Sequence, residues 1–170
     1  MTMRAGIALG SNLGDRLANL RSARACVLKI PGISAPVRDS RIYETEPVNS
    51  GPDAGAYLNA VIDVEYEGQP IALLDALQAI EAGFGRPSKR PRNAPRTIDL
   101  DILYVGNLAL TNQDIAIPHP RLHRRRFVLT PLADVRPELV LPGQQQSVAE
   151  LLAALQDPAE VIIFSETWDA

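Results

Sequence analysis

The sequence has only one cysteine, Cys26, among its 170 residues. An internal disulfide and a cysteine-based metal cluster are therefore excluded, and a cytoplasmic protein is expected. No apolar run approaches the roughly 20 residues that cross a bilayer, and no signal or transit peptide is recognisable at the start. P-loop, G-x-S-x-G and H-E-x-x-H motifs are also missing, which disfavours the nucleotidase, serine-hydrolase and zinc-protease classes that carry them.

There is also no overall excess of positive charge. Seventeen basic and 20 acidic residues give a net charge of −3, whereas a protein that grips nucleic acid by its whole surface is usually basic. Nine of the basic residues nevertheless fall in two short stretches without acids, 86–96 and 121–126. This pattern predicts a local anion-binding site.

Length and periodicity predict a single α+β domain over residues 1–170. Strands mixed with helices, two of them adjacent in sequence, favour α+β over a doubly wound parallel fold. The strand at 57–67 is expected to be half-buried, because a set that includes Asp63 and Glu65 alternates with an apolar set. Helices are expected at 14–30, 70–82, 127–135 and 148–155, and strands at 7–9, 34–44, 57–67, 97–105, 115–117 and 161–164.

The sharpest chemical feature is the segment APRTIDLDIL at 94–103, in which Asp99 and Asp101 alternate with apolar residues. Alternation on a strand puts both carboxylates on one face, roughly 7 Å apart at the backbone. Two close aspartates repel each other unless a cation lies between them, and Mg²⁺ prefers such oxygen ligands. The alternative is a solvated pair on an edge strand. The preceding basic stretch favours a metal–polyphosphate site.

Three other features are less specific. His119 and the arginines of 121–126 could clamp phosphates, or could form a solvated helix face. Glu81 lies at a helix end, where an acidic side chain normally lies on the protein surface. Tyr57 and Asn59 at a strand start could stack on and hydrogen-bond a flat heterocycle, or could be a buried ring and a capping amide.

Taken together, these segments resemble the 6-hydroxymethyl-7,8-dihydropterin pyrophosphokinase family of folate biosynthesis. The resemblance runs from residue 7 to about residue 141, and its most specific part is the P-R-x-x-D-L-D-I sequence. The matching segments occur in the family's order: ALGSNLGD (8–15), YETEP (43–47), YLNA (57–60), Glu81, GR (85–86), APRTIDLDIL (94–103) and PHPRL (118–122).

The resemblance implies an enzyme that uses ATP as co-substrate. The pterin hydroxymethyl oxygen would attack the β-phosphorus of ATP, and the bond from that phosphorus to the α,β-bridging oxygen would break. The products would be AMP and the pterin diphosphate. The family fold would be a ferredoxin-like antiparallel sheet with helices packed on both faces, in three αβα layers. We expect a monomer that binds neither nucleic acid nor membrane.

The resemblance also implies roles for single residues. Asp99 and Asp101 would hold two Mg²⁺ ions on the triphosphate and would be catalytic. Arg92 would belong to a loop that closes over ATP. The expected sets are Arg86, Arg92 and Arg96 for catalysis, Gln78, Glu81, Arg96, His119 and Arg125 for ATP, and Thr45, Pro47, Val48, Tyr57, Asn59 and Phe127 for the pterin.

Some positions depart from the family pattern. Arg126 stands where a small residue is common, which leaves open which of Arg124, Arg125 and Arg126 contacts ATP. Asn93 and Pro120 replace a tryptophan and a tyrosine of some members. Two other functions stay open: a catalytically inactive relative, or one with another heterocyclic acceptor, and an RNA-binding ferredoxin-like module. Against the second function, this sequence lacks the paired aromatic residues on a strand that such RNA-binding modules use.

Overall fold

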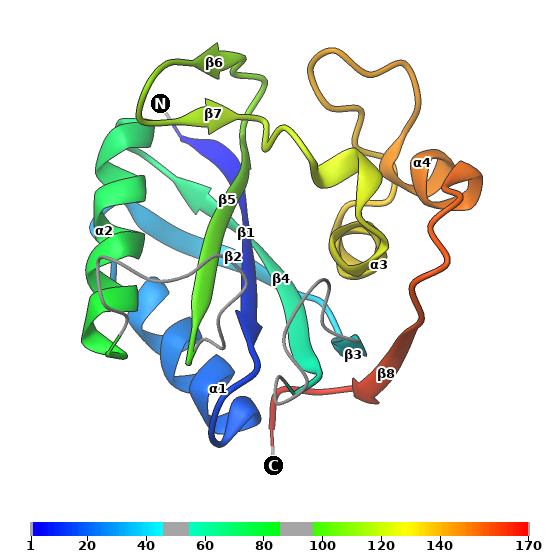
Figure 1. Ribbon diagram of the computed structural model, residues 1–170. Coiled ribbons are helices and arrows are strands. Elements are labelled where there is room, and N and C mark those ends of the chain that lie inside the picture. Colours follow the sequence, from blue (N-terminus) through cyan, green and yellow to red (C-terminus); the bar gives the residue numbers. More distant parts are fainter. Residues whose placement is uncertain (1, 46–54, 86–96, 170) are drawn as a thin grey trace.

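Strands and helices are interspersed along the whole chain (Figure 1). The structure is a computed structural model and describes residues 2–45, 55–85 and 97–169. The elements are β1 (Met3–Ser11), α1 (Arg16–Val27), β2 (Ile33–Asp39), β3 (Ile42–Thr45), β4 (Tyr57–Tyr66), α2 (Pro70–Gly83), β5 (Asp99–Val105), β6 (Leu110–Thr111), β7 (Ala116–Ile117), the 3-10 turn η1 (Leu122–Arg124), α3 (Arg126–Val135), α4 (Val148–Ala154) and β8 (Val161–Ser165).

One antiparallel sheet forms the centre of the molecule. Its strands follow the order β5-β1-β4-β3-β8, β2 also pairs with β4, and β6 and β7 form a separate ribbon. On β1, Gly10 lies opposite both Asp99 of β5 and Asn59 of β4. The next row on the same face holds Ala8 and Asp101. Because opposite residues share a sheet face, both aspartates and the Asn59 amide lie on one side of the sheet.

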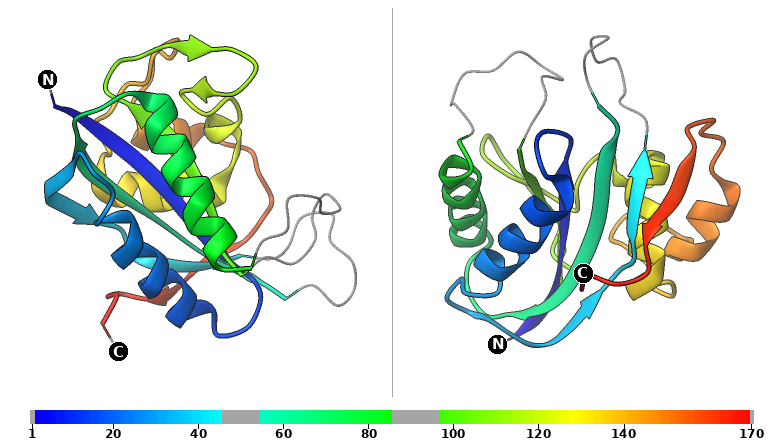
Figure 2. Two further views of the ribbon diagram at one scale, coloured as in Figure 1. Left: turned by 90° about the vertical axis from the view of Figure 1, so that its left-hand side faces the viewer. Right: turned by 90° about the horizontal axis from the view of Figure 1, so that it is seen from below.

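Helices cover both faces of this sheet (Figure 2). On one face, α1 and α2 bury Leu20 and Leu77 against strand residues such as Ile7. On the opposite face, α3 buries residues including Leu129 against a cluster that contains Leu103 of β5. The mixture of an antiparallel sheet with helices is confirmed.

Local sequence signals explain where the helices begin. The Asp15 carboxylate accepts the Ala18 N–H at 3.1 Å at the start of α1, and Pro70 occupies the first turn of α2. Ser147 and Glu150 form a reciprocal capping box on α4. Within the described ranges, no helix is both long and apolar enough to cross a membrane.

The single strand expected at 34–44 is wrong. The segment forms two strands, β2 and β3, which both pair with β4 and are separated at Ser40 and Arg41. The Ser40 N–H donates to the Val61 carbonyl at 2.9 Å, but the Ser40 hydroxyl, rather than a backbone carbonyl, accepts the Val61 N–H. The Ser40 side chain thus takes the place of a backbone carbonyl in the hydrogen-bonding ladder, and the strand is interrupted there.

The half-buried strand expected at 57–67 also needs correction. β4 lies in the middle of the sheet and pairs with β1 on one side and with β2 and β3 on the other. Asp63 is completely buried, because α3 covers the face on which the polar residues of the alternation lie. Alternation shows which residues share a face, but not that both faces of this strand are covered.

Candidate active site

A cavity of about 1250 Å³ opens between the sheet and the start of α3. Its floor comes from β1, β4 and β5, and its sides come from α2, residues 119–128 and residues 155–159. Pockets for a single small ligand are typically about 300–1,000 Å³. The cavity therefore has room for two substrates at once.

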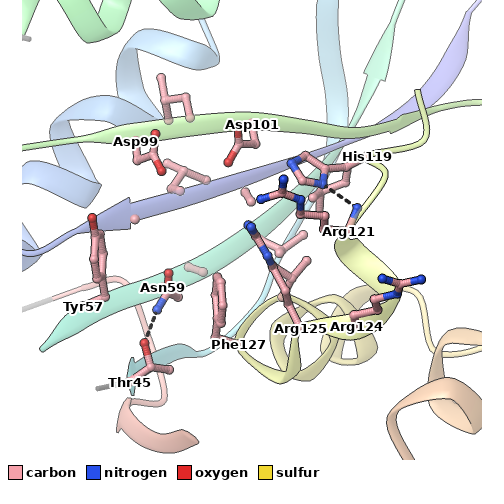
Figure 3. A pocket seen from close by; sticks show the side chains of 18 of the residues that line it. Thr45, Tyr57, Asn59, Asp99, Asp101, His119, Arg121, Arg124, Arg125 and Phe127 are labelled. Carbon is pink, nitrogen blue, oxygen red and sulfur yellow. Dashed lines mark hydrogen bonds between the residues drawn. The ribbon is translucent and has the colours of Figure 1, made fainter. Parts of the chain in front are cut away.

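Asp99 and Asp101 project from β5 into this cavity side by side (Figure 3). Both are half-buried, and their alternate positions place them about 7 Å apart at the backbone. No group of three or more His, Cys, Asp or Glu side chains with metal-binding geometry exists among the described residues. The pair suits a hard cation such as Mg²⁺, which binds through one or two carboxylates and keeps water and phosphate oxygens as its other ligands.

Gly10 keeps the floor of the cavity flat between the aspartates and Asn59. A Cβ atom at this position would lie 3.2 Å from the Asn59 Oδ1 atom and 3.5 Å from the Tyr57 ring. These distances are at or inside ordinary van der Waals contact. The missing side chain therefore leaves space directly between the carboxylate pair and the amide.

Asn59 lies between the side chains of Tyr57 and Phe127 at the other end of the floor (Figure 3). Its Nδ2 atom donates to the Thr45 hydroxyl at 2.7 Å. An amide carries two N–H donors and one carbonyl acceptor, and Thr45 accepts one of these donors. Two rings with a fixed amide between them form a suitable slot for a flat heterocycle with polar edges.

Arg121, Arg124 and Arg125 line the side of the cavity next to the aspartates. The Arg121 and Arg125 side chains extend toward the aspartate pair, whereas the Arg124 guanidinium points away from it (Figure 3). The Arg125 guanidinium also lies 5.5 Å from the centre of the Phe127 ring. This arrangement puts guanidinium groups opposite a candidate cation site, where a polyphosphate would need both.

Glu81 is buried, although an acidic side chain at a helix end normally lies on the surface. Its Oε2 atom accepts the backbone N–H of Leu100 at 2.8 Å, between the two aspartates. Helix α2 thus holds β5 at the point where the carboxylate pair projects. Gln78 lies one helical turn earlier and also lines the cavity.

His119 lies beside the arginines, and its imidazole is held in one orientation. Its Nδ1 atom accepts the backbone N–H of Arg121 at 3.2 Å, and the backbone N–H of His119 donates to the Leu103 carbonyl at 2.9 Å. Burial lowers the pKa of the imidazole, and Arg125 and Arg121 lower it further, against a smaller opposite effect of Asp99. A neutral ring with its Nδ1 atom used as an acceptor carries its proton on Nε2.

We expect an NMR titration of His119 to give a pKa below the usual 6.5 in the folded protein. The unfolded chain then binds more protons, so this group lowers stability as the pH falls from about 6.5 through the folded pKa. The variant His119→Gln should assign the resonance and flatten the dependence of stability on pH in that window. A folded pKa at or above 6.5 would contradict this account.

The structure brings together every predicted site residue that it describes. Ten of them line the cavity: Thr45, Tyr57, Asn59, Gln78, Glu81, Asp99, Asp101, His119, Arg125 and Phe127. Five others lie outside the described residues: Pro47, Val48, Arg86, Arg92 and Arg96. Segment 155–159 also lines the cavity, but it was not predicted, because no local sequence pattern there indicates a ligand.

Comparisons with known proteins agree with this geometry. A relative from Haemophilus influenzae, 2-amino-4-hydroxy-6-hydroxymethyldihydropteridine pyrophosphokinase, is 40% identical over 152 residues, which cover 89% of this chain and 92% of the relative. The protein of the same name from Methylorubrum extorquens is 38% identical over 158 residues, which cover 93% and 96% of the two chains. Both alignments span nearly the whole of each relative.

A solved HPPK-DHPS structure in complex with substrates has the same fold, with a TM-score of 0.72 at 14% identity. The match covers 91% of this chain and 44% of that longer protein. The family described as 7,8-dihydro-6-hydroxymethylpterin-pyrophosphokinase (HPPK) matches residues 6–137. With that match and two nearly full-length relatives, the chain belongs to the HPPK family.

Proposed function

We propose that this protein transfers the β,γ-pyrophosphate of ATP to the hydroxymethyl group of 6-hydroxymethyl-7,8-dihydropterin, in folate biosynthesis. The observation that carries the proposal is a single cavity with two unlike halves. One half has the Asp99 and Asp101 carboxylates facing arginines, and the other has the Asn59 amide between two aromatic rings. Membership of the HPPK family supports the same reaction.

The carboxylate half suits the triphosphate. Asp99 and Asp101 would hold two Mg²⁺ ions, whose charge would stabilise the phosphate oxygens as the transfer proceeds. Arg121 and Arg125 extend toward this pair and can bind phosphate oxygens through charge-assisted hydrogen bonds. The neutral His119 ring offers its Nε2 proton as a further donor, and Gln78 and Glu81 line the ATP side.

The aromatic half suits the pterin. Tyr57 and Phe127 would sandwich the bicyclic ring, and Asn59, fixed by Thr45, would hydrogen-bond its polar edge. Pro47 and Val48 complete the proposed pterin set. The flat floor at Gly10 leaves the space in which the hydroxymethyl oxygen can approach the phosphate held by the other half.

Phosphoryl-transfer enzymes act mainly through alignment and charge stabilisation. Fixing two substrates end to end in one cavity supplies the alignment. Arg86, Arg92 and Arg96 would add positive charge on the phosphate side, where it stabilises the charge of the transferred group.

The finer structural proposals follow the same family. The β1–α1–β2/β3–β4–α2–β5 order, with β4 and β1 in the middle of the sheet, supports a ferredoxin-like unit between helical layers. We propose one domain over residues 1–170 and a monomer. The single exposed, free Cys26 fits the reducing conditions of the cytoplasm.

Analysis of the nucleotide product tests the function directly. The protein is incubated with ATP, Mg²⁺ and 6-hydroxymethyl-7,8-dihydropterin, and AMP is resolved from ADP. We expect pterin-dependent AMP in amounts equal to the pterin diphosphate. ADP would contradict attack at the β-phosphorus, and ATP binding without turnover would indicate another acceptor or an inactive relative.

A further inference from the structure

Residues 155–159 lie between α4 and β8 (Figure 1), and they line one side of the cavity. We call this segment the C-terminal wall. It has no helical or strand hydrogen-bonding pattern of its own, so other parts of the chain must hold it in place. The contacts that do so come mainly from one residue at the start of α3.

Arg126 binds the C-terminal wall through its side chain and its backbone. Its Nη2 atom donates to the Leu155 carbonyl at 3.0 Å, and its Nε atom donates to the Asp157 carbonyl at 3.2 Å. The backbone N–H of Arg126 donates to the Asp157 carboxylate at 3.3 Å. That carboxylate also accepts the Ala159 N–H at 2.9 Å, and its charge at the N-terminus of α3 is favourable.

These contacts give Arg126 a different role from its neighbours. Arg125 and Phe127, on either side of it, line the cavity, whereas Arg126 does not. Its guanidinium donates to backbone carbonyls of the C-terminal wall. Arg126 therefore positions the C-terminal wall, and its guanidinium does not face the phosphate part of the cavity.

The far end of the C-terminal wall reaches the opposite side of the aromatic half. It continues into β8, where Val161 pairs with Thr45 of β3. Thr45 in turn accepts the hydrogen bond that fixes Asn59. The wall thus connects the helix turn that carries Phe127 with the strand that orients Asn59, while the aspartate pair lies on β5.

We infer that Arg126 and Asp157 are positioning residues that hold the C-terminal wall against the aromatic half of the cavity. They would therefore set the affinity for the acceptor substrate rather than for ATP. This inference rests on the proposed function for the identity of the acceptor. Its structural part, that Arg126 fixes residues 155–159, does not depend on the reaction.

The test is steady-state kinetics of Arg126→Ala, with the pterin and ATP varied separately. The two side-chain hydrogen bonds to the C-terminal wall are lost, so the KM for the pterin should rise about tenfold or more. The KM for ATP and kcat should change less than about threefold. Arg126→Lys keeps the charge but lacks the planar guanidinium that donates to both carbonyls. Its pterin KM should therefore lie between those of the wild type and Arg126→Ala.

Two further variants sharpen the comparison. Asp157→Asn keeps the size of the side chain but loses its charge, and it should raise the pterin KM, as Arg126→Ala does. Arg38→Ala removes an exposed arginine from β2, away from the cavity, and should leave both KM values unchanged. Hydrogen exchange at the Ala159 amide should become faster in Arg126→Ala, whether or not substrate is present.

The outcomes separate the inference from the proposed function. A wild-type protein that forms no pterin-dependent AMP contradicts the function, and the exchange at Ala159 then still decides whether Arg126 holds the wall. If the wild type is active, then equal increases in both KM values in Arg126→Ala, or an unchanged pterin KM in that variant, would overturn the inference. Lower thermal stability with unchanged kinetics would also overturn it, because the residue would then be structural only.

Discussion

Asp101→Ala is expected to lower the rate of AMP formation about 10²- to 10³-fold at saturating Mg²⁺, ATP and pterin. Asp99 and Asp101 share one face of β5 and open on the same cavity. Removing one carboxylate would take away one of the two proposed metal ligands, so charge on the transferring group would be less well stabilised. Losses of this size are typical when one preorganised electrostatic contact to the reacting group is removed.

A matched carboxylate elsewhere provides the control for Asp101. Asp75 is exposed on α2 and does not line the cavity, so Asp75→Asn should retain normal turnover. Circular dichroism should show that both variants keep the wild-type fold. Near-normal turnover of Asp101→Ala at saturating Mg²⁺ would contradict the proposed role of the aspartate pair in holding metal ions.

The carboxylate pair could be predicted because its geometry depends on local sequence alone. Alternation of Asp99 and Asp101 with apolar residues fixes which side chains share a face, wherever the strand lies in the sheet. The same holds for the helices, whose apolar spacing and caps lie within short segments. Family resemblance then related the separate segments to one another, and the ten described site residues do meet in one cavity.

Features that depend on distant parts of the chain could not be predicted in this way. The C-terminal wall binds Arg126, about 30 positions earlier, and no motif in either segment indicates the other. Burial of Asp63 depends on the central position of β4 and on α3 packing over it. Periodicity does not specify either the strand order or the covering helix.

A second large effect is expected for stability, from a buried network around Asp63 on the same sheet face as the candidate active site. Arg4 and the Tyr104 hydroxyl donate to the Asp63 carboxylate, and Arg136 Nη1 donates to it at 3.2 Å. The Tyr104 ring reaches Asp63 across Gly6, where a Cβ atom would overlap the ring. Burial and the Asp63 charge raise the pKa of Tyr104 well above its usual value, which keeps the hydroxyl protonated as a donor.

Asp63→Ala should therefore lower the free energy of unfolding by about 3–5 kcal/mol, because it leaves two guanidinium groups and a hydroxyl without their shared acceptor. Urea unfolding followed by circular dichroism measures this loss. If Asp63→Ala does not fold, Tyr104→Phe removes one hydrogen bond and should cost about 1–2 kcal/mol. Glu65→Gln is the control, because Glu65 is a more exposed acceptor for Arg4, and it should cost less than about 1 kcal/mol. Equal losses for Asp63→Ala and Glu65→Gln would mean that the buried carboxylate does not organise the network, and that packing of α3 alone holds this end of the sheet together.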